Sequence, residues 1–159
     1  MSVQPKPEGY HSVTPYLIVD GAAEAIRWYA EALGATEIMR LPMGDKIGHA
    51  EMRIGDSVVM LSDEWPDYGK LGPLKRGGST CGLMIYLDAV DAAFERAVAA
   101  GATVAQAVED QFYGDRSGSI TDPFGHSWTL ATHIEDVPED EMQRRMAAFA
   151  IQAEHEPAE

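Results

Sequence analysis

The chain has 159 residues and a formal net charge of −14, from 12 Lys and Arg against 26 Asp and Glu. This length suffices for one domain with a sizeable core. The acidic charge argues against a nucleic-acid partner, because proteins that bind nucleic acids place basic surfaces against phosphate. No apolar stretch approaches the roughly 20 residues of a membrane span, so we expect no membrane partner. The lone cysteine, Cys81, cannot form an internal disulfide, which favours a reducing cytoplasmic location.

The first half of the chain indicates a strand, a helix and three further strands. Residues 13–19 are β-branched and aromatic, which predicts a strand, and Asp20 is expected to cap the helix that follows. Gly34 is expected to end this helix in the left-handed conformation. The helix has apolar residues at the 3.6-residue period, namely Ala22, Ile26, Tyr29, Ala30 and Leu33. The three strands are predicted at about 36–41, 47–54 and 57–62.

The second half repeats this order. The segment 82–88 matches 14–20, Asp88 is the expected helix cap, and Gly101 the expected helix end. The apolar stripe of this helix consists of Val90, Phe94, Ala97 and Val98. Strands are predicted at about 103–108, 117–121 and 126–132. The run Asp122-Pro123-Phe124-Gly125 predicts a tight turn between the last two strands.

These patterns predict an α+β fold of two tandem βαβββ modules. Module one covers about 12–63 and module two about 80–133, with a crossover loop at about 64–79 and one domain over 1–159. A C-terminal helix is expected over about 138–152, with an apolar stripe of Met142, Met146, Phe149 and Ala150. By default that stripe packs on its own chain, and the alternative is a second chain.

Several motifs resemble one family. They are Pro15-Tyr16-Leu17, His49-Ala50-Glu51, Phe112-Tyr113-Gly114-Asp115-Arg116 and Asp122-Pro123-Phe124-Gly125-His126-Ser127-Trp128. Together with the duplication, they resemble the vicinal oxygen chelate superfamily of glyoxalase I, extradiol dioxygenases and bleomycin resistance proteins, in its PhnB-like branch. The resemblance implies that the eight strands form a curved mixed sheet, an open cup with the ligand site between the halves.

The resemblance also implies four positions for metal ligands. In this chain they fall on Thr14, Met60, Gly82 and Thr129. These side chains do not suit a hard catalytic cation. The residues next to these positions are no better as metal ligands, with the exception of Cys81. A one-residue register slip would turn Cys81 to the opposite face of the sheet, so it does not restore the site. We therefore expect no metal, no cofactor and no glyoxalase I chemistry.

His49 and Glu51 are the candidate catalytic residues. They lie two positions apart, so a strand places them on one face, opposite Ala50 and Met52. Such a pair could bind a cation or transfer a proton. The alternative, which we favour, is a hydrogen-bonded pair on a rim strand. His126 is expected to be structural, and His133 has no identifiable partner in the sequence.

A ligand-binding lining is predicted from the inward-facing positions and from a lid loop at 112–116. Its residues are Thr14, Tyr16, Met60, Gly82, Met84, Tyr86, Tyr113, Arg116 and Thr129. The apolar and aromatic members could equally fill the cup as core. Arg116 could clamp an anionic group, or form a local ion pair with Asp110 or Asp115.

Three functions follow. By resemblance to bleomycin resistance proteins, the leading hypothesis is a cytoplasmic protein that binds and sequesters a small aromatic or cationic compound without metal. The alternative is a lyase, isomerase or epimerase that uses His49 and Glu51 or a non-standard metal site. The third is a duplicated scaffold with a filled cup. A homodimer is expected, because two-fold assembly is the commonest and superfamily members often dimerise.

Overall fold

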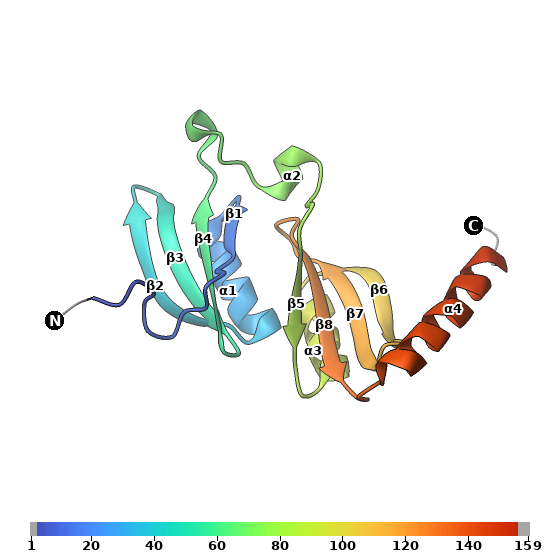
Figure 1. Ribbon diagram of the computed structural model, residues 1–159. Helices are drawn as coiled ribbons and strands as arrows, with labels where there is room; N and C mark the ends of the chain where they lie inside the picture. The colour runs from blue at the N-terminus through green and yellow to red at the C-terminus, as the bar shows by residue number, and fades with distance from the viewer. Residues whose placement is uncertain (1–2, 156–159) are drawn as a thin grey trace.

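The computed structural model describes residues 3–155, which form two modules side by side (Figure 1). Module one contains β1 (Tyr16–Val19), α1 (Ala22–Leu33), β2 (Thr36–Met43), β3 (Lys46–Ile54) and β4 (Ser57–Asp63). The crossover carries the 3-10 turn η1 (Pro66–Tyr68) and the short helix α2 (Pro73–Arg76). Module two contains β5 (Gly82–Tyr86), α3 (Val90–Ala99), β6 (Thr103–Asp110), β7 (Asp115–Thr121) and β8 (Ser127–His133). Helix α4 (Glu139–His155) follows, and the expected domain ends, 1–2 and 156–159, lie outside the described residues.

The predicted α+β architecture with two βαβββ modules is confirmed. Its eight strands are divided between two four-stranded sheets, ordered β1-β4-β3-β2 and β5-β8-β7-β6. The pairs β1–β4 and β5–β8 are parallel. All other strand pairs in the two sheets are antiparallel. No ladder joins the two sheets within residues 3–155, so the single continuous sheet of the expectation is replaced by two.

One face of each sheet is covered by a helix and the other face is open. In module one, strand alternation turns Leu17, Ala50, Met52 and Leu61 toward α1, and all four are buried. The helix buries seven residues, Ala22, Ala25, Ile26, Trp28, Tyr29, Ala32 and Leu33. Ala30, expected in this stripe, is exposed, as is Val98 on α3. Both stripes are thus rotated slightly from the expected ones.

The expected helix caps are wrong. Neither Asp20 nor Asp88 accepts a bond from its helix; the N-caps are Gly21 and Ala89, without side-chain caps of their own. Instead, Asp63 Oδ1 at the end of β4 accepts from the N–H groups of Gly21 and Ala22, at 3.0 and 2.9 Å. The tertiary structure brings this carboxylate to the orphan N–H groups, so the local candidate is not needed.

In module two, the start of α3 is likewise capped by a side chain of the last strand, β8. The hydroxyl of Thr132, near the end of β8, accepts from the Val90 N–H at 3.0 Å and donates to the Leu87 carbonyl at 2.8 Å. Asp63 pairs with the residue before Asp20, and Thr132 lies one residue beyond the partner of Tyr86. The duplication therefore preserved the capping position while changing the residue.

The modules meet through their helices and through the turn at 122–125. The Trp28 indole N–H donates to the Ala100 carbonyl at 2.8 Å, and Arg96 donates to the Ala32 carbonyl at 3.2 Å. The buried Asp122 carboxylate accepts from the Tyr29 hydroxyl of the other module at 2.7 Å. The expected turn is confirmed, since the Gly125 N–H donates to the Asp122 carbonyl at 3.0 Å.

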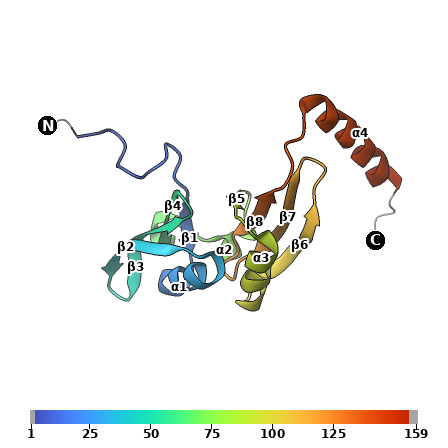
Figure 2. The same ribbon diagram turned by 90° about the horizontal axis from the view of Figure 1, so that it is seen from below.

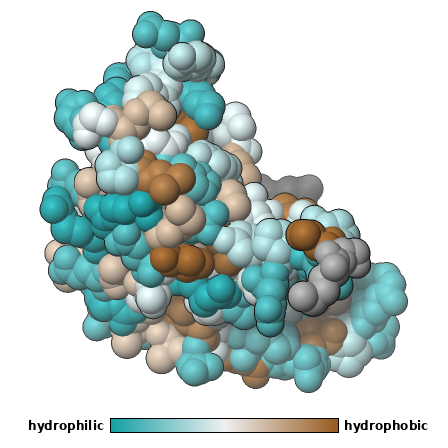
Figure 3. Space-filling view, turned by 90° about the vertical axis from the view of Figure 1, so that its left-hand side faces the viewer, coloured by the Kyte–Doolittle hydropathy of each residue, from teal (hydrophilic) through white to brown (hydrophobic). Residues whose placement is uncertain are grey.

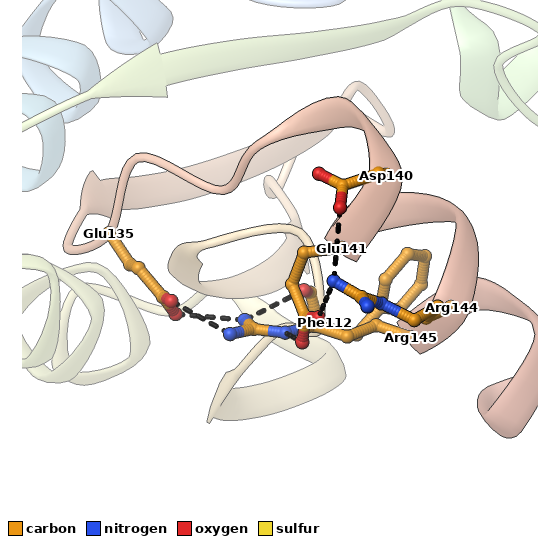
Figure 4. A network of polar contacts seen from close by, with 6 residues as sticks. All are labelled: Phe112, Glu135, Asp140, Glu141, Arg144 and Arg145. Atoms are coloured by element: carbon orange, nitrogen blue, oxygen red, sulfur yellow. Dashed lines mark hydrogen bonds and ion pairs between the residues drawn. The ribbon is translucent and has the colours of Figure 1, made fainter.

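Helix α4 extends away from the two modules (Figure 1). Figure 4 shows Arg145 between Glu135 and Glu141. Its guanidinium lies 2.7 Å from Glu135 and 2.8 Å from Glu141. The Phe112 ring lies 5.3 Å from that of Phe149. The expected packing of the stripe on its own chain is therefore limited to one loop, and Phe149 remains 51% exposed. Within residues 3–155, no helix is long and apolar enough to cross a membrane.

Candidate functional site

The open face of module one carries a row of side chains that crosses the whole sheet. Tyr16 on β1 pairs in register with Met60 on β4, Met60 with Glu51 on β3, and Glu51 with Met39 on β2. His49 lies two residues from Glu51 on the same face, as the sequence predicts. The face opposite α1 therefore presents aromatic, thioether, imidazole and carboxylate groups together.

Four of the polar groups on this face form one hydrogen-bonded chain. The Tyr16 hydroxyl lies 2.9 Å from His49 Nδ1, and His49 Nε2 lies 3.1 Å from Glu51 Oε1. The other oxygen of Glu51, Oε2, accepts from the hydroxyl of Tyr10. We call this set, Tyr10, Tyr16, His49 and Glu51, the module-one polar chain. It positions the imidazole at both ring nitrogens.

Glu51 is the carboxylate of the module-one polar chain, and its neighbours favour the ionised form. It is 8% exposed, and the hydrogen bond from Tyr10, supported by His49, lowers its pKa although partial burial acts in the opposite direction. The same bond raises the pKa of Tyr10. Glu51 is thus an ionised acceptor at neutral pH, suited to bind a hydroxyl or ammonium donor, or to orient His49 as a base.

Tyr10 belongs to an N-terminal arm that crosses the open face. Figure 2 shows this arm and α1 on opposite sides of the sheet of module one. A hollow of about 420 Å³ lies between the arm and the sheet. Its lining consists of Pro5, Lys6, Pro7, Tyr10, His11, Ser12, Thr14 and Met60. Two predicted lining residues, Thr14 and Met60, therefore lie beneath the arm.

Met84 and Tyr86 lie in a different place, a cleft between the two modules. This cleft has a volume of about 590 Å³. Its lining is mainly apolar and consists of Val13, Pro15, Ile54, Gly55, Asp56, Ser57, Val59, Leu83, Met84, Ile85, Tyr86 and Trp128. Met84 is 46% and Tyr86 60% exposed, so neither is a core residue of the monomer. The predicted lining residues are thus divided between two places: Thr14 and Met60 line the hollow under the arm, and Met84 and Tyr86 line the cleft.

The open face of module two carries a second polar cluster. The buried Asp115 carboxylate accepts from the Tyr86 hydroxyl at 2.9 Å and lies 2.7 Å from His133 Nδ1. The other ring nitrogen of His133 lies 3.0 Å from Asp136. Asp115 first, and Asp136 second, raise the pKa of His133. His133 is therefore partnered at both nitrogens, contrary to the sequence-based view that it has no identifiable partner.

The remaining predicted lining residues are dispersed. Gly82 is exposed with open space around it, and the Thr129 hydroxyl lies 3.0 Å from that of Ser119. Tyr113 faces α4 in a shallow groove with Phe112 and Met142. The guanidinium of Arg116 contacts Asp91 and Asp110 at 2.6 and 2.8 Å. Since Asp91 lies on α3, Arg116 is bound on the helix side of the sheet, and its role as a ligand clamp stays a prediction.

The four positions implied for a metal do not fit one. Thr14 and Thr129 offer neutral hydroxyls already bonded to His11 and Ser119, Met60 offers a thioether, and Gly82 offers no side-chain donor. A hard divalent cation prefers carboxylate, water or imidazole ligands. The donor set therefore does not suit the metal of the metal-dependent relatives, and a metal-free protein stays our prediction.

Two residues of these polar clusters, Tyr10 and Asp115, carry no local sequence signal for their contacts. Tyr10 lies in a polar arm without periodicity, so nothing local marks its contact with a strand 41 residues away. The sequence offers Asp115 as a partner of Arg116, whereas its buried carboxylate contacts Tyr86 and His133. Strand alternation indicates only the face of Asp115, which it shares with Ser117 and Ser119, opposite Arg116.

Comparison with known proteins decides the family. The model of the Glyoxalase/Bleomycin resistance protein/Dioxygenase superfamily matches residues 9–130, from the N-terminal arm into the last strand of module two. The chain belongs to this superfamily. The resemblance read from the motifs is thereby confirmed. Because one fold hosts many chemistries, the superfamily alone does not fix the reaction or the ligand.

Relatives within the superfamily support the fold and leave the activity open. An uncharacterized protein of Mycobacterium bovis is 43% identical over 141 residues, which cover 86% of this chain and 93% of the relative. A crystal structure of a Pseudomonas aeruginosa protein is similar at a TM-score of 0.64 and 30% identity, over 79% of this chain and 99% of that one. TioX from Micromonospora is similar at a TM-score of 0.63 and 27% identity, over 78% and 99% of the two chains.

The PhnB-like branch is represented among the similar structures. A PhnB protein from Bacillus cereus has a TM-score of 0.61 over 77% of this chain and 99% of its own. At 16% identity, this likeness concerns the fold alone. The fold is thus what the two proteins share.

Proposed function

We propose that this superfamily member binds a small aromatic or cationic compound in the cleft between its modules and thereby sequesters it. The cleft of about 590 Å³ is the observation on which the proposal depends. Its volume is within the range of pockets that hold small organic ligands. Its walls are largely apolar, and Tyr86 and Met84 remain exposed within it, available to contact a ligand.

The chemistry of the cleft favours an aromatic ligand with a positive charge. The exposed ring of Tyr86 and the polarisable sulfur of Met84 suit the stacking of a flat ring. Asp56, whose side chain is 90% exposed, lies in the same lining, and the whole chain carries a formal charge of −14. This charge attracts cations and disfavours anionic ligands.

The proposal is tested by ligand binding with and without a chelator. Equilibrium dialysis against a panel of aromatic amines and antibiotics should find a ligand with micromolar or tighter affinity, unchanged by EDTA. Metal analysis of the purified chain should find no stoichiometric divalent ion. One tightly bound equivalent of zinc, nickel, iron or manganese would contradict the metal-free proposal.

Variants then locate the ligand. Tyr86→Ala should weaken binding by about fivefold or more, because a stacked aromatic side chain contributes about 1 kcal/mol or more. Tyr68→Ala is the matched control, since Tyr68 is 80% exposed on η1 and lines none of the hollows described above. Equal effects of the two substitutions would place the ligand outside the cleft.

The module-one polar chain supports a second candidate function, acid–base catalysis in a lyase, isomerase or epimerase. Glu51 holds His49 Nε2, and Tyr16 contacts the opposite ring nitrogen, an arrangement that fixes the imidazole. Turnover of 2-oxoaldehyde–thiol adducts by the wild-type chain, abolished by His49→Ala, would establish it. Turnover that survives His49→Ala would remove His49 from the catalytic role.

We further propose a cytoplasmic homodimer. The free and exposed Cys81 suits a reducing compartment. The exposed apolar side chains of α4, Met146 and Phe149, and of the edge strand β2, Leu41 and Met43, suit burial against a second copy. Figure 3 shows the β2 side of the molecule, where hydrophobic patches interrupt a mostly hydrophilic surface.

A further inference from the structure

The N-terminal arm places one of its own phenols on the carboxylate of the open face of module one. Of residues 3–13, Tyr10 alone is half-buried, and the others are exposed. Its hydroxyl donates to Glu51 Oε2, while Glu51 Oε1 lies 3.1 Å from His49 Nε2. The arm thus places a single side chain, Tyr10, against the sheet. The hydroxyl of Tyr10 donates to the ionised carboxylate of Glu51.

The acceptor is built by the sheet and not by the arm. Glu51 and His49 lie on β3, Tyr16 lies on β1, and the three are joined by hydrogen bonds to one another. Strand pairing fixes Glu51 beside Met60, which also lines the hollow under the arm. The sheet therefore offers a fixed carboxylate beside an apolar surface, which suits a ring that carries a hydroxyl group.

The arm itself is attached by few other contacts. Arg53 donates to the Gly9 carbonyl at 3.4 Å, and His11 lies 3.4 Å from the Ser57 hydroxyl and 4.0 Å from Asp56. These contacts are long and exposed, so they contribute little. Displacing Tyr10 would thus cost mainly the bond to Glu51, and an incoming phenol would restore that bond.

We propose that Glu51, oriented by His49 and Tyr16, forms a binding site for a phenolic hydroxyl, and that Tyr10 occupies this site in the free protein. The ligand class is a neutral hydroxylated aromatic compound, which displaces the arm. This site is separate from the inter-module cleft, whose lining includes none of these four residues. It therefore goes beyond the proposed function.

The test removes the internal phenol and supplies an external one. In the full chain with Tyr10→Ala, p-cresol should bind saturably, observed as chemical-shift changes of the His49 ring and a rise of the unfolding temperature. The wild type should bind p-cresol at least about tenfold more weakly, because the tethered Tyr10 competes at a high effective concentration. Toluene, which lacks the hydroxyl, should not reproduce the shift of the His49 ring.

Carboxylate variants identify the acceptor. Adding Glu51→Gln to Tyr10→Ala should weaken p-cresol binding by about tenfold or more, because a hydrogen bond to a charged acceptor is lost. Adding Asp45→Asn, which changes an exposed carboxylate in the turn between β2 and β3, is the matched control and should change little. Tyr10→Leu, which keeps an apolar side chain in the arm, provides a second background if Tyr10→Ala unfolds.

Three results would overturn the proposal. They are no saturable p-cresol binding in either Tyr10 variant, equal binding of toluene, or binding that is insensitive to Glu51→Gln. Failure here is distinguishable from failure of the proposed cleft function, since the cleft responds to Tyr86→Ala and this site to Glu51→Gln.

Discussion

Asp122 shows how one carboxylate can hold a turn and join two modules. It is 4% exposed and accepts from the Tyr29 hydroxyl at 2.7 Å and the Trp128 indole N–H at 2.8 Å. The N–H groups of Phe124 and His126 also donate to it, each at 2.9 Å. Burial, with the charge of Asp122, raises the pKa of Tyr29, which stays a neutral donor. Four donors thus depend on one side chain.

Asp122→Ala should lower the free energy of unfolding by about 3 kcal/mol, because several buried donors lose their acceptor. Tyr29→Phe removes one donor and should cost about 1 kcal/mol. Urea denaturation of both variants measures these values. A smaller loss for Asp122→Ala than for Tyr29→Phe would show that the carboxylate is not the organising group.

His133 should titrate above its ordinary pKa of 6.5, because Asp115 and Asp136 stabilise its charged form. A proton NMR titration of its ring measures the midpoint, and Asp115→Asn should lower it. Since the pKa in the folded state is raised, the contribution of His133 to stability is complete below about pH 6.5 and is lost as the pH rises through the raised value. A midpoint at or below 6.5 would contradict the paired geometry.

At the scale of elements, the helices are capped by strands and not by their own flanking residues. Asp63 is buried and, besides the two N–H groups of α1, accepts from the Ile47 N–H at 2.7 Å. Asp20, the local candidate, has a side chain that is 69% exposed and lies 3.4 Å from Lys75. The carboxylate that caps α1 is therefore that of Asp63, which lies 43 positions after Asp20 in the chain.

Asp63→Ala should destabilise the protein by about 1–2 kcal/mol, as expected for the loss of a helix cap, and the third bond favours the upper end. Asp20→Ala should change the free energy of unfolding by less than about 0.5 kcal/mol, as for an exposed ion pair. Thermal unfolding followed by circular dichroism compares the two. A larger loss for Asp20→Ala would restore the sequence-based assignment.

At the scale of the whole molecule, apolar side chains remain exposed at both ends. Met146 and Phe149 on α4 are each 51% exposed, and Leu41 and Met43 on β2 are 54% and 61% exposed. A homodimer that buries α4 predicts a mass of twice 17.3 kDa by light scattering. Phe149→Asp should shift the chain to the monomer, whereas Val104→Asp, on β6 and 47% exposed, is a control outside α4. A wild-type monomer at micromolar concentration would contradict the dimer.

Local patterns were sufficient for the elements of the two modules and for α4, whereas the short η1 and α2 of the crossover, expected as a loop, were not predicted. The 3.6-residue stripes, the strand alternation and the turn at 122–125 depend on neighbours in the chain, and these features are present near the expected bounds. The placement of His49 and Glu51 on one strand face also followed from alternation alone. In the same way, the duplication was visible because both modules repeat the same local order.

The chain by itself determined two βαβββ modules, their helix-covered faces and the superfamily. Only the tertiary structure decided which groups meet: Asp63 with the start of α1, Tyr10 with Glu51, and Asp115 with His133. It also decided that the eight strands form two sheets with a cleft between them. The reason is physical, because periodicity reports which side of an element is buried, whereas the partner of a polar group depends on how distant segments pack.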